Sequence, residues 1–183
     1  MGIIVNNGHS TLIFVKSLTS SIVIPSITIR IERYQRRYRR MRKGRIDLSN
    51  TVSAEWLRER LRDPDLAIAD CRFVLGDPAA GKLSYENGHL PGAVYFDLER
   101  DLSGPIGIHG GRHPLPEAER LAAKLGAAGI GGASTVVAYD DQGGAMASRL
   151  WWILNYYGHT QVYVLDGGYG GWIRRGYPLE TEV

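Results

Sequence analysis

Short runs of apolar residues alternate with helix-forming segments along most of the chain, and this alternation constrains the fold more than any other feature. The expected strands are "LAIADCRF" (66–73), "GAVYFDL" (92–98), "TVVAY" (135–139) and "VYVL" (162–165). The expected helices are "SAEWLRERL" (53–61), "LPEAERLAAKLG" (115–126), "AMASRLWWILNYYG" (145–158) and "GGWIRRG" (170–176). Apolar strands separated by helices are typical of a parallel sheet covered on both faces. We therefore expect an α/β domain with an open parallel sheet.

Residues at the ends of these segments predict where the helices begin and end. Ser53 is an expected N-cap, Pro116 fits the first turn of the helix over 115–126, and Gly126 is its expected stop. The segment 145–158 is rich in apolar and aromatic residues, including Trp151 and Trp152. Such a helix packs into the core by default, although one face is also suited to contact a second domain.

The first 48 residues differ in composition from the rest of the chain. They carry ten Lys and Arg residues against two acidic ones, a net charge of +8, and nine of the ten lie within "RIERYQRRYRRMRKGR" (30–45). Three interpretations fit: a transit peptide, a tail that binds nucleic acid or an acidic partner, or sequence translated upstream of a true start near Met41. We therefore treat residues 1–48 as a disordered or spurious extension, and expect residues 49–183 to form one domain.

Composition narrows the function classes for residues 49–183. Twelve basic residues against seventeen acidic ones give this part a net charge of −5, which offers no obvious surface for nucleic acid. The chain has one cysteine, Cys71, so an intramolecular disulfide is impossible and a cysteine-based metal site is not expected. No apolar run reaches the roughly 18 residues of a membrane span. We expect no nucleic acid, membrane, metal or cofactor as a partner.

The stretch "TVVAYDDQGGAMASRLWW" (135–152) has the layout of an active-site edge, with a strand end, a glycine-containing turn and a helix start. Chemistry in open α/β sheets gathers at such a place. The turn offers Asp140 and Asp141 but no cysteine, serine or histidine. Two carboxylates therefore stand where a nucleophile is expected.

Two further turns carry candidate structural residues. In "YENGHLPGAVYF" (85–96), His89 precedes the turn formed by Pro91 and Gly92, and we expect its ring to bond backbone groups of that turn. In "VLDGGYGGWIRRGYP" (164–178), Gly167 and Gly168 suit a backbone with positive φ, and Trp172 is expected to pack under the sheet edge. We interpret Asp166 as a helix cap.

These blocks together resemble the rhodanese family of sulfurtransferases, and in particular the N-terminal domain of the two-domain thiosulfate/3-mercaptopyruvate type. The matching pieces are "DCRF", "YENGHLPGAVYFDL", "DLSGP", "VVAYDDQGGAMASRLWWIL", "YYGH" and "VLDGGYGGW". They keep their order across residues 50–180, which is the whole body of the chain. An aromatic residue followed after three positions by His-Leu-Pro-Gly-Ala is typical of the family.

The resemblance implies what the acidic turn replaces. The family uses a low-pKa cysteine at the end of the strand matching "VVAY", in a loop whose N–H groups stabilise the sulfur anion. Asp140 occupies that position here, so we interpret the loop as a vestigial active site. Its residues are Asp140, Asp141, Gln142, Gly143, Gly144 and Ala145. We expect both carboxylates to cap the loop and the following helix, with Arg149 as a candidate partner for one of them.

Two other residues bear on activity. Cys71 follows Asp70 at the end of a different strand, where the family commonly has a small residue, so we expect a packing cysteine. Arg72 matches a family arginine near the active loop of catalytic domains, but without a nucleophile we do not transfer that role.

The single cysteine suits a reducing cytosol, so we expect a cytoplasmic protein. The resemblance implies a sulfurtransferase in which this chain is the inactive N-terminal half. Its expected partner is a second, catalytic rhodanese domain, through which a small sulfur donor and acceptor would react. The alternative is a standalone inactive rhodanese module that binds a protein partner. An adjacent coding sequence for a domain with a cysteine loop would separate the two hypotheses.

Overall fold

The computed structural model describes residues 50–182, so the expectations about residues 1–48 lie outside the described part of the chain. Its strands are β1 (Thr51–Val52), β2 (Leu66–Asp70), β3 (Ala93–Tyr95), β4 (Thr135–Tyr139) and β5 (Val162–Leu165). Its helices are α2 (Ala54–Glu59), α3 (Ala80–Asn87), α4 (Ala118–Ala127), α5 (Ala147–Tyr156) and α6 (Gly168–Arg174).

The five strands form one parallel sheet in the order β1-β5-β4-β2-β3. The central strand β4 is fully buried over its last four residues, as expected for a strand covered on both faces. Asp70 pairs in register with Tyr139 on one side and with Tyr95 on the other. The carboxyl ends of β2, β3 and β4 therefore meet at one edge, and the loop that follows β4 begins there.

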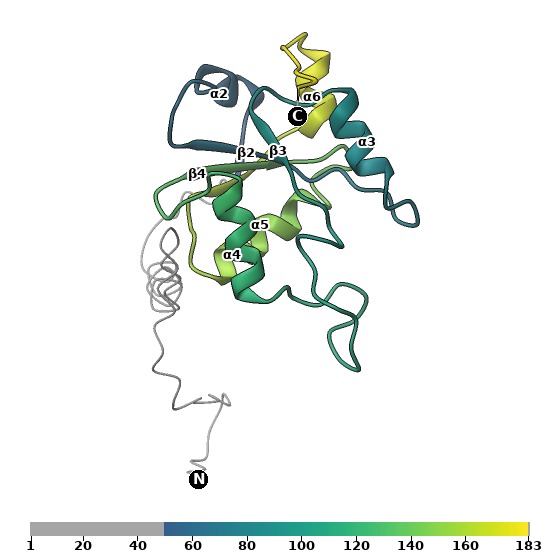
Figure 1. Cartoon of the computed structure of the whole chain (residues 1–183). Helices are drawn as coiled ribbons and strands as arrows, with labels where there is room; N and C mark the ends of the chain where they lie inside the picture. The colour runs from purple at the N-terminus through teal and green to yellow at the C-terminus, as the bar shows by residue number, and fades with distance from the viewer. Residues whose placement is uncertain (1–49, 183) are drawn as a thin grey trace, which may run out of the picture.

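Helices cover both faces of the sheet. Figure 1 shows α4 and α5 on one face and α2, α3 and α6 on the other. The first layer buries Leu121, Leu150 and Ile153 against the sheet, and the second buries Leu57 and Trp172. Burial of large apolar side chains is the main stabilising contribution of these layers. The expected α/β architecture is confirmed.

Helix ends follow the expectations only in part. Ser53 caps α2 as expected, with its hydroxyl accepting the Trp56 N–H at 3.1 Å. The helix α4 starts after Pro116 and continues through Gly126, so both of those boundary predictions were wrong. Gly129 ends α4 instead: it adopts φ +72°, and its N–H donates to the Gly126 carbonyl. This left-handed residue lets the chain turn back without a Cβ clash.

The aromatic helix α5 divides its side chains between core and surface. Trp151 packs against the buried cluster, whereas Trp152 is 44% exposed and stacks on the half-exposed Tyr156. Within residues 50–182, no helix has the length and apolar character needed to cross a membrane.

Candidate functional site

The carboxylate of Asp140 lies at the centre of the loop between β4 and α5. Its Oδ1 accepts the backbone N–H groups of Gln142 and Gly144, each at 2.8 Å. Its Oδ2 accepts those of Met146 and Ala147, at 2.7 and 2.8 Å. Asp140 is only 1% exposed, so protein donors replace the water that would otherwise surround this side chain.

The loop conformation follows from two successive glycines. Gly143 and Gly144 have φ angles of +71° and +90°, a region that residues with a Cβ rarely adopt. The resulting turn aims successive N–H groups inward, in the manner of a backbone anion nest. Because α5 starts at Ala147 and its N-cap Met146 makes no side-chain cap, Asp140 supplies the acceptor for the helix start.

The two acidic residues differ in their surroundings. Asp141 is exposed and makes no hydrogen bond or ion pair within residues 50–182, so the expectation that both carboxylates act as caps was wrong for Asp141. Arg149 pairs with neither of them. It donates instead to the carbonyls of Leu102, His113 and Pro114, because its guanidinium reaches toward the segment before α4.

Neighbouring segments fix the Asp140 loop from two sides. The Gln142 side-chain amide donates to the carbonyl of Phe73, which follows β2. On the other side, the Tyr169 N–H donates to the Asp140 carbonyl at 2.8 Å. Gly143 and Ala145, the other expected loop residues, lie exposed on its outer side. The loop is thus held in one conformation by the strand ends around it.

The turn before α6 contacts the site through its glycines. Gly167 and Gly168 have φ angles of +74° and +52°, as the sequence predicted. Gly167 is the N-cap of α6, which receives no side-chain cap, so the assignment of Asp166 as a cap was wrong. Trp172 in this helix is fully buried and donates its Nε1–H to the carbonyl of Pro178 at 2.8 Å.

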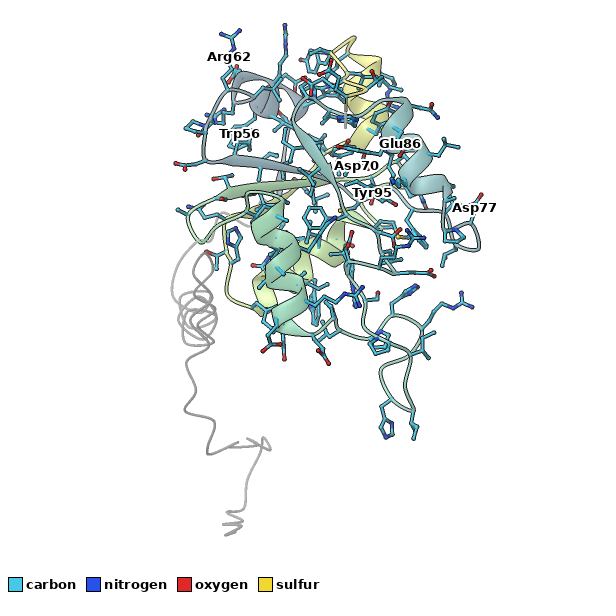
Figure 2. All side chains as sticks on the ribbon, viewed as in Figure 1. Trp56, Arg62, Asp70, Asp77, Glu86 and Tyr95 are labelled. Carbon is cyan, nitrogen blue, oxygen red and sulfur yellow. The ribbon has the colours of Figure 1, made fainter. Side chains whose placement is uncertain are left out.

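A buried ion pair lies beside the loop, at the end of β2. Arg72 donates through Nε to both Asp70 oxygens and through a terminal nitrogen to Oδ2 at 2.6 Å. The Tyr139 hydroxyl donates to the same carboxylate at 2.6 Å, and Tyr95 lies next to Asp70 on β3 (Figure 2). Burial, with the adjacent Asp70 charge, raises the pKa of Tyr139 far above its ordinary value.

Arg72 is committed to this structural network. It is 3% exposed, also donates to the Gly88 carbonyl at 2.7 Å, and lies 4.0 Å from the centre of the Tyr169 ring. The Arg72 guanidinium thus contacts the Asp70 carboxylate, the Gly88 carbonyl and the Tyr169 ring at once. Arg72 therefore holds the ends of β2 and α3 together.

Cys71 is inaccessible as a nucleophile. The residue is 1% exposed and belongs to the core cluster on the α4 and α5 face. Its Sγ lies 3.9 Å from the carbonyl of Ala69. Burial raises the pKa of this thiol well above its ordinary value, and the carboxylates of Asp70 and Asp140 raise it further. The environment favours a neutral thiol.

His89 is held inside its turn. Its ring stacks on Tyr85 at 4.0 Å between centroids, and Nδ1 lies 2.9 Å from the Tyr85 carbonyl. Its backbone pairs with Glu180, whose carboxylate accepts the Gly92 N–H at 2.8 Å. Gly92 follows Pro91 and adopts φ +71°. These contacts give His89 a structural role in the turn.

The sequence did not identify the partners of three side chains in the site region. Arg149 was expected to pair with an aspartate, but it is the one charge in the apolar helix α5, and that isolation was the available signal for a buried partner of another kind. Gln142 and Glu180 reach backbone groups far along the chain, and no local pattern identifies such partners. Within residues 50–182, no three His, Cys, Asp or Glu side chains gather as a metal site.

The site therefore has the layout of an anion-binding loop in which the bound anion is the carboxylate of Asp140. Both oxygens of Asp140 already accept two N–H groups each. These four N–H groups are therefore not available to a bound anion.

Comparison with known proteins identifies relatives of this chain. The chain is 49% identical over 131 residues to the probable 3-mercaptopyruvate sulfurtransferase of Pseudomonas aeruginosa, matching 70% of this chain and 46% of that protein. It is 38% identical to human 3-mercaptopyruvate sulfurtransferase, matching 71% of this chain and 45% of the human protein. The chain thus spans about half the length of these relatives.

A solved structure and a family model agree with these relatives. SseA of Escherichia coli, a 3-mercaptopyruvate sulfotransferase, superposes with a TM-score of 0.67 at 34% identity, over 74% of this chain and 51% of SseA. The model of the rhodanese-like domain matches residues 53–175. The chain therefore belongs to the rhodanese-like domain family.

Proposed function

We propose that this chain is the N-terminal, noncatalytic half of a cytoplasmic sulfurtransferase of the thiosulfate/3-mercaptopyruvate type. In this proposal it supports a second rhodanese domain, which carries the nucleophile and passes a sulfane sulfur from a small donor to a thiophilic acceptor. One observation supports the proposal: in the loop between β4 and α5, the carboxylate of Asp140 accepts four backbone N–H groups.

A sulfurtransferase loop must stabilise a thiolate and then a persulfide, so its N–H groups must be free to point at sulfur. Asp140 stands where the family resemblance places the cysteine, and its carboxylate accepts four N–H groups of the loop. Cys71 offers no substitute, because it is buried in the core and its pKa is raised. Neither residue can form the covalent intermediate.

The lengths of the relatives support the second part of the proposal. The chain corresponds to 46% of the Pseudomonas aeruginosa protein and 45% of the human protein. The remaining length in each relative is sufficient for another domain of comparable size. A second, catalytic domain would explain how the relatives are active although the Asp140 loop of this chain has no nucleophile.

The test compares this chain with the protein encoded by its complete reading frame. Both are assayed for thiosulfate:cyanide and 3-mercaptopyruvate sulfurtransfer, and only the longer protein is expected to turn over. Turnover by this chain alone that Cys71→Ser abolishes would contradict the proposal. A complete reading frame with no cysteine-loop domain would favour a standalone module that binds a protein partner.

A further inference from the structure

Asn87, the last residue of α3, has an exposed side chain that makes no hydrogen bond or ion pair within the described residues. The next residue is Gly88, which has no Cβ to shield its backbone nitrogen. The two other asparagines of the described chain, Asn50 and Asn155, precede a threonine and a tyrosine. The Asn155 amide also donates to the Trp151 carbonyl at 2.9 Å. Among these asparagines, only Asn87 combines a free amide with a following glycine.

The Gly88 nitrogen is held by one bond of the last helical turn. Its N–H donates to the Tyr85 carbonyl at 3.1 Å, at the end of α3. Terminal turns fray, so they open at a lower free energy than the interior of a helix. Once this bond opens, the Gly88 nitrogen is free to approach the side-chain carbonyl carbon of Asn87. Ring closure between these two atoms is intramolecular, which greatly raises its rate over a reaction between separate molecules.

We propose that Asn87 is a site of spontaneous deamidation, at which the side-chain amide is replaced by a carboxylate through a cyclic imide with Gly88. The Gly88 nitrogen bonds to the side-chain carbonyl carbon and gives up its proton, and the amide group leaves with that proton as ammonia. Water then adds to one of the two imide carbonyls and reopens the ring. The net reaction consumes water and releases ammonia, with no oxidation or reduction. It is independent of sulfur transfer, because it needs only these two residues and water.

The position at which the ring reopens decides the form of the backbone. Cleavage at the side-chain carbon yields aspartate. Cleavage at the main-chain carbon yields isoaspartate, whose backbone runs through Cβ and Cγ and is longer by one carbon. Both products place a new negative charge at the carboxyl end of α3, where the helix dipole disfavours it. Isoaspartate in addition displaces the residues that follow.

The extra carbon would enter a segment whose backbone is fixed by distant partners. The buried Gly88 accepts a terminal N–H of Arg72 at its carbonyl, at 2.7 Å. His89 exchanges two backbone hydrogen bonds with Glu180, each at 2.9 Å. Hydrogen bonds of this kind need N···O distances of about 2.7–3.2 Å, which a lengthened backbone disturbs. Isoaspartate at position 87 is therefore expected to release the pairing between His89 and Glu180.

The first experiment measures deamidation of the full chain under native conditions. The protein is incubated at mildly alkaline pH and digested with trypsin, and the peptide 83–100, in which Asn87 is the only amide side chain, is followed by mass spectrometry. A synthetic peptide of the same residues gives the rate without the fold. We expect Asn87 in the folded protein to convert at a rate of the same order as in the peptide, while Asn155 keeps its amide. Asn87→Gln should leave the peptide 83–100 unchanged over the same time.

Two results of this experiment would overturn the proposal. If Asn87 keeps its amide while the synthetic peptide converts fully, the fold protects the site. If Asn155 converts as fast as Asn87, an exposed amide before glycine is not the cause. The chain's other Asn-Gly pair, residues 7–8, lies in the separate tryptic peptide 1–16 and does not enter the measurement.

The second experiment tests the change in the backbone by hydrogen exchange. Asn87→Asp is the matched control, because it carries the same new charge on an ordinary backbone. Aged wild-type protein, enriched in isoaspartate, is expected to lose protection over residues 88–92 and 179–182, and Asn87→Asp is expected to keep it. Equal loss in Asn87→Asp would assign the effect to charge, and full protection in the aged protein would show that the fold accommodates isoaspartate. Either result would overturn the release of Glu180.

Discussion

Gly168 lies directly against the backbone of Asp140. The N–H of the next residue, Tyr169, donates to the Asp140 carbonyl at 2.8 Å, and a Cβ built on Gly168 would lie 2.3 Å from that oxygen. The turn before α6 and the loop after β4 are therefore in a contact that tolerates no side chain at this position. The conformation of the acidic loop depends on a glycine 28 residues further along the chain.

Gly168→Ala is expected to destabilise the domain by about 3 kcal/mol or more. The left-handed backbone costs a residue with a Cβ about 1–2 kcal/mol, and the clash with the Asp140 carbonyl adds to that cost. Gly176→Ala is the matched control: Gly176 also has a positive φ, +66°, but no atom lies within 4 Å of the added Cβ. Denaturant midpoints should show a clearly smaller loss for the control, and equal losses would refute the role of the contact.

Asp140→Ala is expected to lower the free energy of unfolding by about 2–3 kcal/mol. This exceeds the loss of an ordinary cap, because four N–H groups lose their acceptor inside the loop. Asp141→Ala removes the same charge from an exposed position and should cost less than about 0.5 kcal/mol. Urea denaturation of the two variants measures the difference. Similar free energies of unfolding for the two variants would show that the hydrogen bonds of the Asp140 carboxylate do not stabilise the domain.

His159→Gln is expected to reduce the loss of stability in acid. His159 is 8% exposed with its Nε2 unpartnered, and burial lowers the pKa of its ring. The imidazole therefore binds a proton more tightly in the unfolded chain than in the folded domain. The contribution of neutral His159 to the free energy of unfolding is fully present above the ordinary pKa of 6.5, and it is lost as the pH falls from 6.5 toward the lower pKa of the folded state.

Denaturant midpoints at neutral and mildly acidic pH measure this effect. The wild-type domain should lose more stability than His159→Gln between the two conditions. His109→Gln, a change in the exposed loop 104–114, is the control and should keep the wild-type slope. An unchanged slope in His159→Gln would assign the acid sensitivity to other groups.

Cys71 is expected to resist alkylation in the folded protein. Its thiol is buried and its pKa is raised, so little thiolate forms and reagent has no access at mildly alkaline pH. Iodoacetamide labelling followed by intact mass should be slow in native buffer and rapid in denaturant. Rapid labelling of the native protein would show an accessible thiolate and would reopen Cys71 as a candidate nucleophile.

Four of the five strands were predictable from sequence because each is a local run of apolar residues, whereas the two-residue strand β1 was not predicted. Runs such as "TVVAY" have no polar alternation, which is sufficient to indicate a strand covered on both faces. The helix α3 was missed because its sequence, "AGKLSYEN", buries only Gly81 and Tyr85. Gly81 disfavours a helix by propensity, yet the fold requires it, since a Cβ there would lie 2.2 Å from the Arg72 carbonyl oxygen.

The candidate site was predictable only where its bonds are short in sequence. Asp140 and its four donors lie within seven residues of one another, so capping rules were enough to anticipate them. Arg149 bonds to Leu102 across 47 positions, and Glu180 bonds to Gly92 across 88. Such partners depend on which strands are neighbours in the sheet, and a single sequence does not specify that order.

The antiparallel pairing of His89 with Glu180 places the physical boundary of the domain beyond the residues that the family model matches. That match ends at 175, but the backbone of Glu180 exchanges two hydrogen bonds with His89, and its carboxylate holds Gly92. A protein trimmed at residue 175 would leave the backbone of the His89 turn without these partners. Any transplantation of this domain into another protein must therefore carry the chain through Glu180.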